Sequence, residues 1–259
     1  MDFKNLLLET SPEKQIAYLT INREKKRNAL DIETIQELGQ AFDHIENLDA
    51  VRAVILTGKG EKAFAAGADI AEFKDFDSAR GKEMSQNGHQ VFDKIENFTK
   101  PVLAAIHGFA LGGGCELAMA CHLRIATHHA KFGQPEVGLG TIPGYGGTQR
   151  LTRLIGKTKA LEFLMSGEPI TASNAENLGL VNYVVDPENL MNKAEEFLDP
   201  IKEKSPLALK KVIECVNAAE TEKGFEKEQE AFGAAFDTED FKEGTDAFLN
   251  KRSPNFKGK

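Results

Sequence analysis

Strand-like and helix-like segments alternate along the first half of this 259-residue chain, and this alternation constrains the possible fold most strongly. Short apolar runs rich in β-branched residues occupy residues 6–9, 16–21, 51–57, 102–106 and 123–126. Residues 31–48 and 85–98 instead carry apolar side chains at steps of three and four, as one face of a helix does, with Asp31 as a plausible N-cap. Strands that alternate with helices predict crossover connections and therefore an α/β protein with a mainly parallel sheet.

The charge balance is acidic, because 32 Lys and Arg residues stand against 40 Asp and Glu residues and leave a net charge of −8. Such a chain lacks the positive field that non-specific nucleic-acid binding requires, so we expect no nucleic-acid partner. Three cysteines without C-x-x-C spacing predict neither a disulfide framework nor a zinc site, and a reducing compartment is the default. We find no leader-like N-terminus and no apolar run long enough to cross a bilayer, and therefore expect a cytoplasmic protein without a membrane partner.

From about Ala172 onward the pattern is mostly helical, apart from a short predicted strand at residues 180–185. Large apolar rings occur in this tail at Phe225, Phe232, Phe236, Phe241 and Phe248. The short helices that carry them are too small to bury so much apolar surface alone. The rings therefore pack either on their own domain or on a neighbouring subunit, and the pattern by itself favours neither arrangement.

Residues 108–147 contain the strongest indication of chemistry. A strand runs into the triple glycine that begins at Gly112, and a helix of small residues is predicted directly after it, over residues 115–121. The unpaired N–H groups at a helix start can bind an oxyanion, although tight helix–sheet packing explains a glycine run as well. Glu116 lies in the first turn of this apolar helix, where a buried carboxylate is costly unless it has partners.

A second carboxylate, Glu136, follows Gln134 and Pro135 and precedes a glycine-rich loop. Loops of this kind place polar groups over a rigid scaffold, but most single Pro-Glu pairs are ordinary exposed residues. Residues 64–70 follow another predicted strand and offer a second backbone N–H, or simply a strand-to-helix turn. Taken alone, neither segment identifies a reaction.

Four segments in this order resemble the enoyl-CoA hydratase/isomerase, or crotonase, superfamily: RNAL from Arg27, AFAAGADI from Ala63, GFALGGGCELA from Gly108 and FGQPEVGLGTIPGYGGTQRL from Phe132. The resemblance runs in register from about Ile16 to the end of the chain. It implies a crotonase-like coil of repeated β-β-α turns over residues 1–195. It also implies a helical C-terminal oligomerisation region over residues 196–259, and hence a homotrimer or a dimer of trimers.

The resemblance implies roles for individual residues. The backbone N–H groups of Ala68 and Gly113 match the two donors that bind the thioester oxygen, and Glu116 and Glu136 match the glutamate pair of the hydratases. The implied reaction is the reversible syn-addition of water to a trans-2-enoyl-CoA, which gives a 3-hydroxyacyl-CoA. The other candidate contacts to this acyl-CoA thioester are Ala29, Ala66, Asp69, Ile70, Gly112 and Tyr145, with Phe248 and Lys251 reaching in from a neighbouring subunit.

Other reactions stay open. A double-bond isomerase, a lyase or a thioester hydrolase shares the fold, and a non-catalytic acyl-CoA-binding or RNA-binding member is a more distant alternative. The presence of both Glu116 and Glu136 favours a hydratase over these. No cofactor is expected, because hydration moves no electrons and coenzyme A is part of the substrate. No metal is expected either, because the six histidines lack metal-ligand spacing.

Two features of the substrate contacts are also undecided. A basic cluster is a candidate for binding the CoA phosphates, or is only a solvated loop: Arg23, Lys25, Lys26 and Arg27. Tyr145 either shortens the acyl pocket and favours crotonyl-sized substrates, or it points elsewhere.

Overall fold

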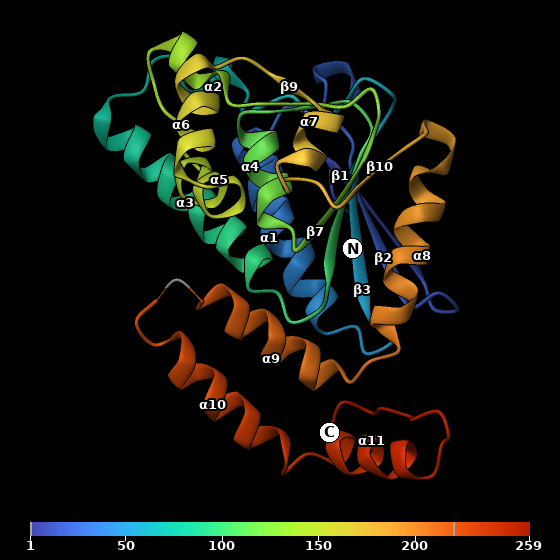
Figure 1. Ribbon diagram of the computed structural model, residues 1–259. Helices are drawn as coiled ribbons and strands as arrows, with labels where there is room; N and C mark the ends of the chain where they lie inside the picture. Colours follow the sequence, from blue (N-terminus) through green and yellow to red (C-terminus); the bar gives the residue numbers. More distant parts are fainter. Residues whose placement is uncertain (1, 220) are drawn as a thin grey trace.

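The computed structural model describes residues 2–219 and 221–259, and a six-stranded sheet forms its centre (Figure 1). In spatial order its strands are β1 (Leu6–Ser11), β2 (Ile16–Ile21), β3 (Ala53–Gly58), β5 (Val102–Ile106), β7 (Leu123–Thr127) and β10 (Tyr183–Val185). Strand β1 pairs antiparallel with β2, and the other four pairings are parallel. Each strand overlaps a predicted apolar run, so the prediction of a mainly parallel sheet is confirmed.

A second sheet is built from four shorter strands: β4 (Ala63–Ala65), β6 (Phe109–Leu111), β8 (Lys131–Gly133) and β9 (Ile170–Thr171). The first three are parallel neighbours, and β9 runs antiparallel to β8. Each of β4, β6 and β8 follows a strand of the large sheet within a few residues and leads into a helix. This succession is the repeated β-β-α turn that the resemblance implies. Strands this short show no alternating pattern, which explains why the sequence predicted none of the four.

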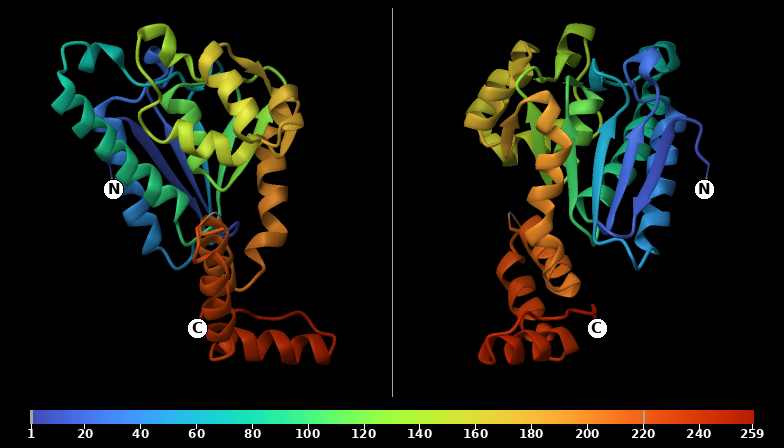
Figure 2. Two further views of the ribbon diagram at one scale, coloured as in Figure 1. Left: turned by 60° about the vertical axis from the view of Figure 1, so that its left-hand side comes forward. Right: turned by 90° about the vertical axis from the view of Figure 1, so that its right-hand side faces the viewer.

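Helices cover both faces of the large sheet (Figures 1 and 2). One face packs against α1 (Ile32–Glu46), α3 (Ser78–Glu96) and α4 (Gly113–Ala120), and the other against α8 (Leu190–Lys202). On the α8 face, Leu190 and Leu198 share an apolar cluster with Ile55 and Leu103. Strands buried on both faces need apolar residues at nearly every position, which explains the continuous apolar runs in the sequence.

The start of α1 was predicted correctly and that of α3 was not. The Asp31 side chain accepts a hydrogen bond from the Thr34 N–H at 2.8 Å and so caps α1. Helix α3 begins at Ser78 rather than Ser85, and Asp77 caps it. The first two turns of α3 are largely exposed and polar, so no apolar periodicity marked them in the sequence.

Helix α4 begins at Gly113, two residues before the predicted start, and all eight of its residues are buried. Gly112 is its N-cap and has φ 49°, a backbone conformation that favours glycine. A side chain on Gly114 would collide with the carbonyl oxygen of Ala65, so glycine there allows α4 to pack directly on β4. Tight helix–sheet packing, one of the two interpretations of the glycine run, is therefore present.

Four further helices connect the strands or follow them: α2 (Ile70–Phe73), α5 (Gly147–Ile155), α6 (Lys157–Ser166) and α7 (Ala172–Asn177). Short 3-10 turns occupy η1 (Glu24–Lys26), η2 (Pro135–Leu139) and η3 (Pro187–Asn189). No described helix is long and apolar enough to cross a membrane.

The chain ends in three helices that project away from both sheets (Figures 1 and 2): α9 (Pro206–Asn217), α10 (Gly224–Ala235) and α11 (Glu239–Leu249). The predicted helical C-terminal region is confirmed, whereas the predicted division at residue 195 falls inside α8. Among the residues described in α9 and α10, none is buried. Phe236 contacts Phe232 and Phe241, but Phe225 and Phe248 remain 82% and 83% exposed.

Candidate active site

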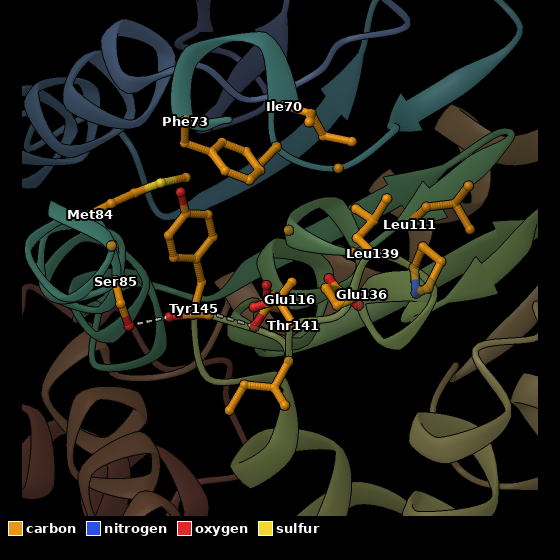
Figure 3. Close-up of a pocket in the computed structure, with 18 of the residues that line it drawn as sticks. Ile70, Phe73, Met84, Ser85, Leu111, Glu116, Glu136, Leu139, Thr141 and Tyr145 are labelled. Carbon is orange, nitrogen blue, oxygen red and sulfur yellow. Dashed lines mark hydrogen bonds between the residues drawn. The ribbon is translucent and has the colours of Figure 1, made fainter. Parts of the chain in front are cut away.

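The segments that follow β4, β6 and β8 line one cavity of about 250 Å³ (Figure 3). Residues 66–70 follow β4, residues 111–116 end or follow β6, and residues 135–145 follow β8. Because these strands are parallel neighbours, the residues after them meet at one edge of the sheet, a common ligand position in α/β folds. Helix α3 closes the cavity with Met84 and Ser85, and Ser85 Oγ donates to the carbonyl oxygen of Gly144 at 2.6 Å.

Ala68 and Gly113 each present a backbone N–H at this cavity. Gly113 is the first residue of α4, so its N–H has no acceptor within the helix. Leu30 donates to Gly67 O at 2.8 Å and accepts from Asp69 N at 2.9 Å, which directs the N–H of the intervening Ala68 away from Leu30. A Cβ atom on Gly113 would lie 3.6 Å from Ala68 N, so the two residues are close enough to serve one acceptor.

Glu116 is 1% exposed, and its Oε1 accepts hydrogen bonds from the N–H groups of Tyr145 and Gly147, each at 2.7 Å. Burial raises the pKa of Glu116 to about 7; the two N–H groups oppose this rise, and the charge of Glu136 adds to it. A carboxyl group with this pKa can gain or lose a proton near neutral pH. The two N–H groups are the partners that a buried carboxylate at this position requires.

The carboxylate of Glu136 faces the same space as that of Glu116 (Figure 3). Glu136 is half-buried in η2, and burial raises its pKa too. The side-chain amide of Gln134 is buried. In the amide orientation that satisfies its hydrogen-bonding groups, its NH2 donates to both carboxylate oxygens of Glu136, each at 3.1 Å. A Cβ atom on Gly112 would lie 2.7 Å from Glu136 Oε1, so any side chain at this position would displace the carboxylate. The sequence did not single out Gln134.

Arg150 is a second residue that the sequence did not single out. Its guanidinium is buried and donates to the carbonyl oxygen of Tyr145 at 2.8 Å. The same group donates to Asp93 at 2.5 Å and to Glu96 at 2.7 Å, both on α3. Arg150 therefore anchors to α3 the loop whose N–H groups hold Glu116. Nothing in the sequence distinguishes it from Arg153, which follows one turn later and is 47% exposed.

Four of the other predicted contact residues line the cavity: Ala66, Ile70, Gly112 and Tyr145. Ala29 and Asp69 are not among the residues that line it; the carbonyl oxygen of Ala29 and the carboxylate of Asp69 accept hydrogen bonds from Arg23. Arg23 also pairs with Asp31 at 2.6 Å, so this member of the basic cluster is engaged within the fold. The described residues contain no group of three or more His, Cys, Asp or Glu that could hold a metal ion.

Phe248 and Lys251 lie far from the cavity within one chain. Phe248 belongs to α11 and Lys251 follows it, whereas α2, whose Ile70 and Phe73 line the cavity, lies at the opposite end of the molecule (Figure 1). A single subunit therefore does not bring these two predicted contacts to the substrate.

The coil of β-β-α turns with a helical tail defines a protein of the crotonase fold. A family model described as enoyl-CoA hydratase/isomerase matches residues 11–259, and the chain belongs to this family. The short-chain-enoyl-CoA hydratase of Clostridium acetobutylicum is 46% identical over 255 residues, which cover 97% of each chain. The crotonyl-CoA hydratase of Syntrophomonas wolfei is 45% identical over 259 residues, which cover 99% of each chain. The crystal structure of an enoyl-CoA hydratase subunit I from Geobacillus kaustophilus matches at a TM-score of 0.93 and 40% identity, over 100% of both chains.

Proposed function

We propose that this protein is an enoyl-CoA hydratase, which adds water reversibly across the 2,3-double bond of a trans-2-enoyl-CoA. The observation that carries the proposal is a single cavity with two facing carboxylates, Glu116 and Glu136, beside the N–H groups of Ala68 and Gly113. Relatives 46% and 45% identical over nearly their whole length are named as hydratases of short-chain enoyl-CoA and crotonyl-CoA, which supports the same reaction here.

In this mechanism the N–H groups of Ala68 and Gly113 bind the thioester oxygen. As the oxygen of water adds at C3, negative charge moves onto the thioester oxygen and an enolate develops. Donors that are already in place stabilise this charge, and one such donor is typically worth about 2.7–4 kcal/mol. The amino end of the buried helix α4 adds a favourable partial charge at the same position.

The two glutamates divide the proton transfers. Glu116 takes a proton from the attacking water, and Glu136 delivers a proton to C2 on the same face, which gives syn-addition. Burial raises the pKa of Glu116 to about 7, so this carboxyl group can both take up and release a proton near neutral pH, as proton transfer requires. The reaction gains one water and exchanges no electrons. The proposal therefore includes no cofactor, and coenzyme A enters only as part of the substrate.

Oligomerisation through the tail is part of the proposal. The exposed rings of Phe225 and Phe248 support a homotrimer or a dimer of trimers, in which α9 to α11 pack on neighbouring subunits. In such an assembly, Phe248 and Lys251 of one subunit reach the CoA moiety bound to another. A cytoplasmic location stays a prediction from the sequence.

The test is the loss of the ultraviolet absorbance of the conjugated thioester when crotonyl-CoA is added. We expect rapid loss and a 3-hydroxybutyryl-CoA product with the unmodified protein. Glu116→Gln and Glu136→Gln should each lower turnover by roughly 100-fold to 10,000-fold, the usual contribution of general acid–base catalysis.

A Gln at position 116 keeps an oxygen that can accept from Tyr145 N and Gly147 N, so its fold should be retained. Glu188→Gln, at an exposed position outside the cavity, is the matched control and should retain full turnover. Undiminished turnover in both cavity variants would exclude the two-glutamate mechanism. A shifted double bond or free CoA as the product would indicate isomerase or hydrolase chemistry instead.

A further inference from the structure

A second cavity of about 560 Å³ lies between α1 and α3, directly beyond the wall of the proposed active site. Its lining combines apolar side chains, among them Ile35, Phe76 and Val91, with polar ones that include Arg80 and Glu83. Met84 and Tyr145 are the two residues that line both cavities. These two side chains therefore separate the active-site cavity from a groove that could accept an alkyl chain.

The Tyr145 ring is held firmly in this wall. It is 4% exposed and packs edge-on against Phe92, with ring centroids 5.4 Å apart. A side chain on Gly88 of α3 would overlap the ring, so glycine at that position makes room for it. In the close-up the ring extends from the loop beside Glu116 toward Met84 and Phe73 (Figure 3).

The wall is close to the proposed reacting atoms. A Cβ atom on Gly113, one of the two thioester-oxygen donors, would lie 3.3 Å from Cδ2 of Tyr145. The N–H of the same tyrosine holds Glu116 at 2.7 Å. An acyl chain that leaves the reacting carbons toward α3 therefore meets the ring after only a few methylene groups.

We propose that Tyr145 and Met84 form the end wall of the acyl pocket and restrict the enzyme to short enoyl chains. The groove lined by Ile35, Phe76 and Val91 is the space that a longer chain would enter without this wall. This inference rests on the proposed hydratase function and adds to it the length of the acyl chain. The phenol itself takes no part in the reaction, because the backbone N–H of Tyr145, and not its side chain, contacts Glu116.

The test compares kcat/KM for crotonyl-CoA with that for the ten-carbon trans-2-decenoyl-CoA. The unmodified protein should prefer crotonyl-CoA. Tyr145→Ala should shift the ratio toward decenoyl-CoA by about tenfold or more, since each methylene newly buried in an apolar groove gives roughly a fourfold gain. Tyr145→Phe, which keeps the wall, should leave the ratio unchanged. Leu139→Ala enlarges the same cavity at an exposed loop and should also leave it unchanged.

A second variant tests whether the groove receives the chain. Adding Val91→Phe to Tyr145→Ala places a ring in the groove and should reverse the gain with decenoyl-CoA. The proposal is overturned if Tyr145→Ala keeps its crotonyl-CoA activity and its chain-length ratio, or if the unmodified protein accepts both substrates equally. Should Tyr145→Ala fail to fold, Met84→Ala carries the same comparison with the same outcomes.

The experiments distinguish a failure of the hydratase proposal from a failure of the proposal that Tyr145 and Met84 end the acyl pocket. If the unmodified protein hydrates neither substrate, calorimetric binding of butyryl-CoA and decanoyl-CoA tests the wall without turnover. Tighter binding of decanoyl-CoA by Tyr145→Ala than by the unmodified protein would still support it. Identical affinities in the two proteins would refute it.

Discussion

The sheet core and the helical tail bury the same kind of side chain very differently. Phe42, Phe92 and Phe132 of the core are fully buried, whereas Phe225 and Phe248 of the tail are almost fully exposed. Within one chain the core buries most of its large apolar side chains, whereas the tail leaves several of its own exposed. This difference supports the proposal that the rings of the tail pack on a neighbouring subunit, while both glutamates lie in the core of a single chain.

Charged residues show the same contrast. Arg150 of the core is 4% exposed and binds Asp93, Glu96 and the carbonyl oxygen of Tyr145. Arg252 of the tail makes a comparable pair of ionic contacts, but its side chain is 42% exposed. An ion pair in water contributes little to stability, whereas removing one partner of a buried pair leaves uncompensated groups behind.

The largest expected effect comes from breaking the buried arginine network. Arg150→Met should destabilise the protein by about 3 kcal/mol, because the buried guanidinium donates several hydrogen bonds and a charged hydrogen bond is worth roughly 1.5–3 kcal/mol. It should also lower kcat more than it raises KM, because the loop that holds Glu116 loses its anchor to α3. Urea unfolding and steady-state kinetics with crotonyl-CoA measure the two effects.

Arg252→Met is the matched control in the tail, and we expect no measurable change in its Tm or kcat. Equal destabilisation by the two substitutions would contradict the contrast between core and tail. An unchanged kcat in Arg150→Met would show that this arginine supports the fold without positioning Glu116.

A smaller effect should follow from acidification of the core at His122. This side chain accepts from Val102 N at 3.0 Å and lies 3.0 Å from the carbonyl oxygen of Glu96, so it is held as neutral imidazole. Burial lowers its pKa from 6.5 to about 4. The unfolded chain therefore binds a proton between these values while the folded chain does not, and stability falls as the pH drops through this window.

Between pH 7 and pH 5 the loss at His122 should be about 2 kcal/mol. Glu116 acts in the opposite direction, because its raised pKa stabilises the folded state as the pH falls from about 7 toward 4.5. The measurement is thus the difference in unfolding free energy between the unmodified protein and His122→Gln at several pH values. His129→Gln, at an exposed position, should show the same pH dependence as the unmodified protein. Parallel profiles for all three proteins would refute the assignment.

The smallest expected effect concerns an exposed ring of the tail, Phe248. Phe248→Ala should raise KM for crotonyl-CoA roughly fivefold and leave kcat unchanged, since an aromatic contact of this kind is worth about 1 kcal/mol. Sedimentation velocity should show a particle about three or six times the 28.4 kDa chain, as expected for the proposed trimer or dimer of trimers.

Phe225→Ala is the control for a tail ring that was not predicted to contact CoA, and its KM should stay unchanged. A monomeric particle that is fully active would show that activity does not require the tail of a neighbouring subunit. An unchanged KM in Phe248→Ala within an intact oligomer would remove this residue from the CoA contacts.

The strands show where sequence-based prediction works and where it stops. Those of the large sheet were predictable because burial on both faces imposes continuous apolar runs such as 102–106. Strand β6, only three residues long, carries no such signal, although the residues after it form one side of the cavity. The start of α3 was missed for a related reason, because its exposed first turns lack an apolar face.

The site residues divide in the same way. Glu116 and Glu136 were identified because they stand within motifs that resemble a family, and not because their surroundings could be read from the chain. Gln134 and Arg150 emerged only in the structure, where each supports one of the two glutamates. For the Arg23 cluster the sequence left two interpretations open, and it did not indicate the ion pair of Arg23 with Asp31, which depends on how two segments pack.

The alternation of strands and helices, the cap of α1, the family and the choice of the two glutamates as candidates all follow from the amino-acid sequence. Each depends on residues that are close together along the chain. The meeting of the segments after β4, β6 and β8 at one cavity became visible in the three-dimensional fold. The same fold also decided that Tyr145 separates this cavity from a groove, and that Phe248 lies far from it in one subunit. Burial, pKa and the distance between remote residues depend on how parallel strands pack side by side, and no local pattern specifies that packing.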